Sequence, residues 1–319
     1  MKGNQKIMGS KSFSSTSSSQ SQNSSKRKIR LATNFAVAVA CILIIVKLFA
    51  WYLSGSVVLL SSFIDSVMDA FASVINLFAV RHAMQPADTE HRFGHGKMEA
   101  VAGLAQAAFI LGSGVFIFVE AVSRILNPVD LKMGSLAIGV MSFSMLLTAG
   151  LVVFQRHVSR KTGSLAIKAD ALHYTSDFLM NSGVIIALIL VISLGWQLAD
   201  PIAGMLVALI IVYSAINIAR QSIDRLMDRE LPDEDREKIR NIIISHSEVV
   251  NFHDLRTRSS GLDVFIQFHL EMDGALTLNE AHKFCDEVEA SIIETYPNAK
   301  VIIHADPEGI AEGHQVFPT

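Results

Sequence analysis

The stretch SGSVVLLSSFIDSVMDAFASVINLFAV, residues 54–80, is long and apolar enough to cross a lipid bilayer, yet it contains two aspartates, Asp65 and Asp69. Because the two are four positions apart, their side chains would lie on one face of a helix, one turn apart. A charged side chain inside a membrane span costs roughly 2.5 kcal/mol or more and is retained only where it faces the bundle interior and has a partner. We therefore expect this helix to turn both carboxylates toward a partner inside the bundle.

A second stretch of the same kind is AIKADALHYTSDFLMNSGVIIALILVISL, residues 166–194, in which His173 and Asp177 are again four positions apart. A buried cluster of three carboxylates and one imidazole is not tenable without a metal ion or protons. Three oxygen donors and one nitrogen donor form a tetrahedral set that suits Zn²⁺ and is tolerable to Fe²⁺, Cd²⁺ or Mn²⁺. The predicted metal site comprises Asp65, Asp69, His173 and Asp177. A proton relay or a metal-free hydrogen-bonded cluster is the alternative.

The composition of the whole chain agrees with a membrane protein. Of its 319 residues 50% are hydrophobic and only 18% are charged, and the mean hydropathy is +0.40. Soluble domains usually contain about 25% charged residues. We expect an all-α transmembrane domain of six helices in the lipid bilayer, and so a multi-pass integral membrane protein. The predicted spans are residues 31–53, 56–80, 99–125, 134–156, 166–194 and 202–224.

The basic residues are distributed unevenly among the connecting segments. They gather before the first span, after the second, after the fourth and after the sixth, whereas the other loops contain only Lys132 and Arg124. By the positive-inside rule, both termini are expected in the cytoplasm. The same distribution gives no support to nucleic-acid binding, because the basic residues follow the membrane side rather than form one soluble patch. Lys47, near the outer end of the first span, is expected to extend toward the lipid headgroups.

The domain boundaries follow from changes in composition. Residues 1–27 are rich in serine and lack the apolar content to fold, which predicts a disordered tail. Residues 28–228 form the transmembrane domain, residues 229–307 a cytoplasmic domain and residues 308–319 a second tail. Within residues 229–307, hydrophobic periodicity predicts the order αββαβ, a small two-layer α+β domain.

The loop between the second and third spans contains Asp88, His91 and His95. Three such ligands on a short loop can hold a metal ion with water in the fourth position. The alternative is a basic interfacial loop whose histidines and arginines meet lipid headgroups.

The cytoplasmic domain contains a third group of candidate ligands. A lone histidine on a strand is usually an ordinary surface residue, but five candidates in so small a domain favour metal binding. His304 and Asp306 are two positions apart on a predicted strand, so their side chains point to one face, where a carboxylate can bridge two ions. The predicted set is His253, His269, His282, His304 and Asp306.

Six motifs at separate places in the chain resemble one family. They are LSSFIDSVMD (60–69), HRFGHGK (91–97), ADALHYTSD (169–177), LMDRELP (226–232), HDLRTR (253–258) and VIIHADP (301–307). On these motifs the chain is similar to the cation diffusion facilitator family over about residues 28–307. The resemblance implies a homodimer of six-span protomers, each with a metallochaperone-like cytoplasmic domain that takes part in dimerisation.

The resemblance also implies roles for the candidate ligands. Asp65, Asp69, His173 and Asp177 would form the transport site, and the loop set a second site. The cytoplasmic set would bind two ions at the dimer interface, with Asp306 bridging them. Lys97 and Asp228 are similar to the family's charge interlock near the membrane surface. An aspartate rather than a histidine leads the first helix pair, which by analogy implies a broader choice among metals.

The expected function is efflux of a divalent cation, Zn²⁺ or Fe²⁺ and also Cd²⁺ or Mn²⁺, in exchange for protons by alternating access in a bacterial inner membrane. Metal binding requires deprotonated ligands, and His173 is the natural proton carrier. Zn²⁺ is expected both as cargo and as a structural ion in the cytoplasmic domain. The alternative is a membrane-anchored sensor or scaffold that binds metal without moving it. An enzyme is not expected, because the membrane site is already four-coordinate and the chain has no HExxH motif.

Overall fold

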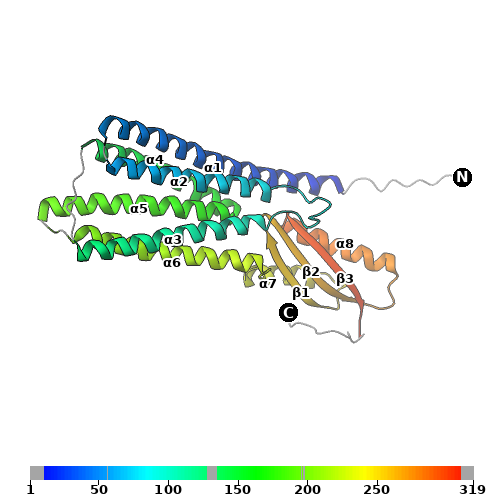
Figure 1. Cartoon of the computed structure of the whole chain (residues 1–319). Helices are drawn as coiled ribbons and strands as arrows, with labels where there is room; N and C mark the ends of the chain where they lie inside the picture. Colours follow the sequence, from blue (N-terminus) through cyan, green and yellow to red (C-terminus); the bar gives the residue numbers. More distant parts are fainter. Residues whose placement is uncertain (1–10, 56, 128–134, 195, 197, 310–319) are drawn as a thin grey trace. The chain divides into compact units, whose positions relative to one another are not determined.

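The computed structural model describes residues 11–55, 57–127, 135–194, 196 and 198–309 (Figure 1). Its contacts place Arg27–Leu226 in a helical unit and Met227–Thr319 in a C-terminal unit. The helical unit contains five long helices and the part of a sixth, α1, from Arg27 on. The six are α1 (Lys11–Ser54), α2 (Val57–Ala83), α3 (Met98–Leu126), α4 (Ser135–Thr162), α5 (Leu165–Leu194) and α6 (Ala199–Leu226). Five of these, all but α5, have the length and apolar composition of a membrane span among the described residues. The predicted helical transmembrane domain is confirmed.

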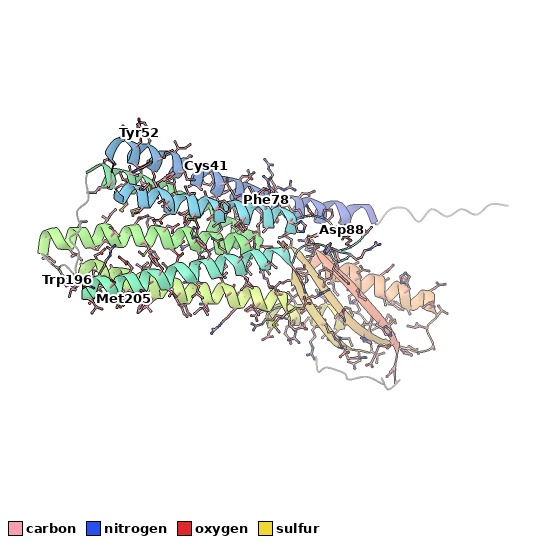
Figure 2. All side chains as sticks on the ribbon, viewed as in Figure 1. Cys41, Tyr52, Phe78, Asp88, Trp196 and Met205 are labelled. Carbon is pink, nitrogen blue, oxygen red and sulfur yellow. The ribbon has the colours of Figure 1, made fainter. Side chains whose placement is uncertain are left out.

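Helix α5 lies at the centre of the helical unit. It packs against α3, α4 and α6, and more lightly against α2. Large apolar side chains on the outer helices are exposed, among them Tyr52 at 80% and Phe78 at 65%, both labelled in Figure 2. A surface of this kind suits lipid, whereas Asp69 of α2 and His173 and Asp177 of α5 face one another inside the bundle. The bundle therefore separates an apolar exterior from a polar interior, as the first two stretches predict.

Two glycines bring α3 and α6 close together. A Cβ atom at Gly103 would lie 2.9 Å from Ser222 Oγ, and one at Gly114 would lie 2.8 Å from Val212 Cγ2. Side chains at these positions would push the two helices apart, which is why small residues favour close packing of membrane helices. The α3–α6 pair forms one wall of the cavity described below.

Helix α1 begins earlier than the predicted tail allows. Residues 1–10 lie outside the described part of the chain, but Lys11–Ser54 is one helix, so residues 11–27 of the predicted disordered tail are helical. Helix growth is cooperative, because adding a turn to an existing helix avoids the cost of nucleation. The apolar part of α1 supplies that nucleus, and the serine-rich segment extends it.

The C-terminal unit has the predicted αββαβ order. Its elements are α7 (Asp233–Ile244), β1 (Asn251–Ser260), β2 (Asp263–Met272), α8 (Leu278–Thr295) and β3 (Ala299–Pro307). The sheet order is β1-β2-β3, with β1 antiparallel to β2 and β2 parallel to β3. One sheet face packs on α7 and α8 through Ile266, Phe268, Ile239 and Ile292. The alternate residues of each strand lie on the opposite face of the sheet.

Helix α8 begins with a capping box. Thr277 Oγ1 accepts a hydrogen bond from the backbone N–H of Glu280 at 3.4 Å, and Glu280 Oε2 accepts one from the backbone N–H of Thr277 at 2.9 Å. This reciprocal pair satisfies two of the amide groups that a helix N-terminus leaves open. The hydrogen bonds from Thr277 also lower the pKa of the Glu280 carboxyl.

We expect Thr277→Ala to loosen the first turn of α8. Loss of a threonine cap typically costs about 1 kcal/mol, so amide hydrogen exchange in that turn should accelerate about fivefold. Thr295→Ala is the matched control, because Thr295 is exposed in the last turn of the same helix. Equal exchange in the two variants would show that the cap does not stabilise α8.

Candidate metal transport site and two further ligand clusters

The ionisable residues of α2 and α5 meet inside the helical unit. His173 Nε2 lies 3.1 Å from Asp69 Oδ1 and 3.7 Å from Asp177 Oδ2. One ligand atom from each of the three residues lies within 4.8 Å of the others. Two ligands of a tetrahedral Zn²⁺ with bonds of about 2.0–2.1 Å are about 3.3 Å apart. The separations of 3.1 and 3.7 Å are close to this value and the third is at most 4.8 Å, so small movements of the carboxylates bring all three atoms to one metal ion.

Asp65 lies beside this cluster and does not join it. It is exposed on α2, one turn before Asp69, and it lines the same cavity of about 500 Å³. That cavity is bounded by α2, α3, α5 and α6 and also contains Asn181, one turn beyond Asp177. The structure thus brings three of the four predicted ligands together and places the fourth on the cavity wall.

Lys47 of α1 lines the same cavity, which the sequence did not predict. Its Nζ donates a hydrogen bond to Ser66 Oγ at 2.7 Å, and Ser66 lies on α2 between the two aspartates. The expectation that Lys47 extends to the headgroups is therefore wrong. Hydropathy places a lysine at a depth in the membrane but does not say which way its helix face turns. Here the ammonium group shares a cavity with the transport-site carboxylates.

The cavity continues toward one end of the helices. Asp65, Phe116 and Met180 also line a second cavity of about 310 Å³, which extends to Glu120, Arg124 and Asp200. Arg124 donates to Glu120 Oε1 at 3.0 Å and to Asp200 Oδ2 at 2.9 Å, where the C-terminal end of α3 meets the start of α6. The polar path from the metal cluster therefore leads away from the basic loops.

The opposite end of the helical unit is packed with apolar side chains. Ala107 of α3, Leu165 and Ala169 of α5 and Ile218 of α6 form a buried cluster, with Leu172 against it. These residues lie between the metal cluster and the basic ends of the helices. In this conformation the ligands face one end of the bundle and are closed off from the other.

The loop after α2 assembles the second predicted set. Asp88 Oδ2 lies 3.3 Å from His95 Nε2, and Asp88 Oδ1 lies 3.4 Å from His91 Nδ1. The backbone N–H groups of His91 and Glu90 donate to Asp88 Oδ1 at 2.6 and 3.0 Å. These donors hold the pKa of the Asp88 carboxyl below its usual value. The loop thus keeps Asp88 ionised and within reach of both imidazoles; Figure 2 labels Asp88 on this loop.

A further histidine adjoins this loop cluster. The ring of His82, from the last turn of α2, lies 4.7 Å from the ring of His95, centroid to centroid. The sequence offered no reason to connect the two, because His82 precedes the loop and fits no ligand spacing. It is an additional candidate for the loop site.

The third predicted set lies on the sheet face that α7 and α8 do not cover, where three histidines on neighbouring strands form a histidine row. His253, His269 and His304 are register partners on β1, β2 and β3. A β-bulge follows His253, with φ of 54° at Asp254, and turns both Phe252 and Leu255 toward the core. The imidazole rings are 5.0 Å apart between β1 and β2 and 4.7 Å apart between β2 and β3.

Asp306 contacts this row with both carboxylate oxygens. Its Oδ2 lies 2.8 Å from His269 Nδ1 and 4.0 Å from His253 Nε2, while its Oδ1 lies 3.1 Å from His304 Nε2. Ligand atoms of His253, His269 and Asp306 lie within 4.8 Å of one another. A carboxylate whose two oxygens face different histidines has the arrangement needed to bridge two ions.

Glu271 belongs to the same face and was missed from the sequence. It is the register partner of Asp306, and its Oε1 lies 2.9 Å from His253 Nδ1. A carboxylate on the second ring nitrogen fixes the orientation of a ligating histidine and raises its basicity. The signal was present, because Glu271 is two residues after His269 and so shares its face of the strand.

His282 lies apart from the other cytoplasmic ligands. It is exposed on α8, where its nearest recorded carboxylate is Asp286 at 3.9 Å. Helix α8 packs on the core face of the sheet, whereas the histidine row lies on the opposite face. Within one protomer, His282 is therefore not part of the cluster.

Lys97 and Asp228 each have a partner within their own unit. Lys97 Nζ donates to the backbone oxygen of Leu226 at 3.3 Å, and Arg258 Nη1 donates to Asp228 Oδ2 at 3.1 Å. Asp228 has a positive φ of 56°. The predicted interlock between the two residues stays a prediction.

Comparison with known proteins follows the same division. Residues 34–227 match the model of the cation efflux transmembrane domain, and residues 231–308 match that of the cation efflux protein cytoplasmic domain. The chain is 46% identical over 281 residues to "Cation-efflux pump FieF" of Yersinia pestis (strain Pestoides F), covering 88% of this chain and 93% of that protein. The same values hold for the protein of that name from Yersinia pseudotuberculosis serotype O:3.

The chain is also similar to solved structures of cytoplasmic domains of metal transporters. The metal-bound C-terminal domain of the CzcD transporter from Thermotoga maritima is 25% identical and covers 25% of this chain and 93% of its own, with a TM-score of 0.24. The assignment to a family rests on the two family models and on the relatives that align with 88% of this chain. This chain belongs to the cation efflux family, also called the cation diffusion facilitator family, whose members transport metal ions and are not enzymes.

Proposed function

We propose that this protein exports a divalent cation, Zn²⁺ in the first place, from the cytoplasm across a bacterial inner membrane in exchange for protons. The observation that carries the proposal is the cluster of Asp69, His173 and Asp177, three ligands from two membrane helices at metal-site spacing. Carboxylate and imidazole donors suit Zn²⁺, and the same set accepts Fe²⁺ or Cd²⁺. Asp65 completes a tetrahedral set when it turns inward from the cavity wall.

Proton exchange follows from the chemistry of the ligands. A metal ion binds only deprotonated carboxylates and neutral imidazole, so its arrival releases protons and their return displaces it. His173 is the proposed carrier, because an imidazole gains and loses a proton near neutral pH. Its Nε2 is buried and faces the carboxylates of Asp69 and Asp177, which can hold either a proton or a metal ion on that nitrogen.

The two ends of the helical unit suggest the direction of transport. Basic loops flank the sealed end, and the positive-inside rule assigns that end, with both termini, to the cytoplasm. The open path past Asp65 to Arg124 then faces outward. Alternating access requires the apolar seal around Leu165 and Ile218 to part while the outer path closes. We propose that the described conformation is the one that releases metal.

We expect Asp69→Asn to abolish Zn²⁺-driven proton movement in proteoliposomes, because the variant loses a ligand and one negative charge. Flux is followed with a zinc indicator and a pH dye, and Zn²⁺ binding is measured on the same preparation. Asp224→Asn is the control, since Asp224 lies on α6 and lines neither transport cavity. Retained exchange in Asp69→Asn would refute the site. Wild-type protein that binds Zn²⁺ without flux would instead favour the sensor alternative.

Lys47 is proposed to act as a tethered cation that competes with the transported ion. It shares the cavity with the acidic ligands, and an ammonium group opposes a second cation there. A fixed unit charge in a partly buried site changes the affinity for a dication by about tenfold or more.

We therefore expect Lys47→Met to bind Zn²⁺ at least about tenfold more tightly and to turn over more slowly, because release becomes limiting. Lys47→Arg is the control that retains the charge and should bind Zn²⁺ as the wild type does. Calorimetric affinities and proteoliposome rates measure the two effects. Weaker binding in Lys47→Met would contradict the competition, since it would make Lys47 a support for the site.

The histidine row is proposed to bind two ions where two cytoplasmic units meet in a homodimer. The match to a dimerisation-type cytoplasmic domain supports a dimer, and the position of His282 gives a reason for it. His282 lies on the helix side of the sheet, so it can join the row only by coming from a second protomer. Metal bound there would favour the associated state by mass action.

We expect His282→Ala to raise the Zn²⁺ concentration needed to bring the two cytoplasmic units together, by about tenfold or more, because a ligand is lost. Energy transfer between dyes on the two protomers measures the approach. Lys283→Ala is the control, a neighbouring exposed residue on α8 that pairs with Glu287. An unchanged midpoint in His282→Ala would exclude a ligand from the second protomer.

A further inference from the structure

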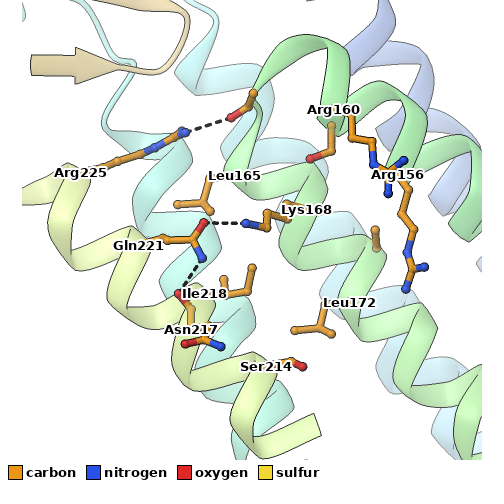
Figure 3. Close-up of a pocket in the computed structure, with 13 residues that line it drawn as sticks. Arg156, Arg160, Leu165, Lys168, Leu172, Ser214, Asn217, Ile218, Gln221 and Arg225 are labelled. Atoms are coloured by element: carbon orange, nitrogen blue, oxygen red, sulfur yellow. Dashed lines mark hydrogen bonds between the residues drawn. The ribbon is translucent and has the colours of Figure 1, made fainter. Parts of the chain in front are cut away.

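A third cavity opens among α4, α5 and α6, near the basic ends of these helices (Figure 3). Its volume is about 700 Å³, and it shares no lining residue with the two cavities of the transport path. It lies entirely within the helical unit. Leu165, Leu172 and Ile218 separate this cavity from the metal cluster in this conformation, and no ligand of that cluster lines it. Its charged lining therefore needs its own explanation.

Four cations line this cavity and no carboxylate does. They are Arg156 and Arg160 of α4, Lys168 of α5 and Arg225 of α6. Like charges gathered in one concave site repel one another, and a bound anion relieves that repulsion. The cavity is therefore built for a ligand with negative charge.

The hydrogen bonds of these cations go to neutral acceptors. Lys168 Nζ donates to Gln221 Oε1 at 2.6 Å, and Arg225 Nη2 donates to the backbone oxygen of Gly163 at 3.0 Å (Figure 3). Arg156 Nη2 donates to Thr175 Oγ1 at 3.1 Å. These contacts orient the cationic groups and leave their charge uncompensated. Ser214 and Asn217 add neutral polar groups further along α6.

The wall beyond the cations is partly apolar, beside the polar Ser214 and Asn217. Leu165, Leu172 and Ile218 line it, and the cavity runs along the helices in the direction of the membrane interior. Outward-facing apolar residues continue the same exterior, with Val153 on α4 and Ile216 on α6 exposed. A cationic rim followed by an apolar wall matches an amphiphile with an anionic head. A soluble anion would make no use of the wall.

We propose that this cavity binds the phosphate group of an anionic phospholipid, such as phosphatidylglycerol, with an acyl chain against the apolar wall. Basic pockets between transmembrane helices on the cytoplasmic side bind anionic headgroups in this way. The phosphate would connect the ends of α4, α5 and α6 through charge-assisted hydrogen bonds. Helix α5 carries two ligands of the metal cluster, so the lipid would brace the scaffold of the transport site.

The test is native mass spectrometry of the full-length protein with dioctanoyl phosphatidylglycerol, dioctanoyl phosphatidylcholine or inorganic phosphate. We expect one phosphatidylglycerol per protomer, bound at least about tenfold more tightly than phosphatidylcholine. In the variant that combines Lys168→Gln with Arg225→Gln, this affinity should fall roughly 25-fold, because each basic residue near an anionic lipid contributes about fivefold.

The control combines Lys161→Gln with Arg220→Gln, which removes two charges from the ends of α4 and α6 outside the cavity. It should retain the preference for phosphatidylglycerol. An equal loss in both double variants, or no preference in the wild type, would overturn the proposal. Inorganic phosphate that binds as tightly as the lipid would also overturn it, in favour of a soluble anion.

Zn²⁺ binding to the variants serves as the folding control. Should the double variant lose Zn²⁺ binding, Arg160→Gln takes its place, with a fall in phosphatidylglycerol affinity of about fivefold as the expected result. An unchanged affinity in a folded Arg160→Gln would then count against the cavity as the lipid site.

Discussion

Carboxylates held between membrane helices need a positive partner, and that need organises this molecule. Asp65, Asp69 and Asp177 face one cavity, where separating three negative charges from water is unfavourable unless a cation is near. The structure offers a fixed cation in Lys47 and a geometry for a mobile one between Asp69, His173 and Asp177. A site that contains both binds the metal ion less tightly than a site of ligands alone, because the lysine and the metal ion compete for the same carboxylates. A transporter benefits, because an ion bound too tightly is not released.

The packing of the helices supplies the second requirement, a site open to one side at a time. Gly103 and Gly114 let α3 and α6 approach closely enough to act as one wall, and α5 carries two ligands along that wall. Apolar side chains close one end, while polar and charged residues line the other. The side chains that form the closed end are apolar, so parting them breaks no hydrogen bond between those side chains.

The sequence predicted the elements well and the contacts between them unevenly. Ligands four apart on a helix share a face whatever the helix packs against, so the pairing of Asp69 with His173 and Asp177 was foreseeable. Lys47 was misplaced because depth in the membrane does not give rotation about the helix axis.

Glu271 was missed because its partner, Asp306, is set by strand register. The separation of His282 from the row depends on which sheet face α8 covers, which periodicity alone does not state. Helical residues 11–27 show that a polar composition does not stop a helix that an apolar span has already nucleated.

Lysine and arginine side chains have opposite roles at two places in the bundle. The groups that surround each cation determine whether it competes with a metal ion or attracts an anion. Lys47 faces carboxylates, so its charge competes with a cation for a common set of oxygens. Arg156, Arg160, Lys168 and Arg225 face amide, hydroxyl and carbonyl groups, so their charge is left for an anion to balance. Net charge and loop counting treat these five residues alike, as basic residues of a membrane protein. Only the chemistry of the atoms around each cationic group separates a residue that tunes metal binding from residues that hold a lipid.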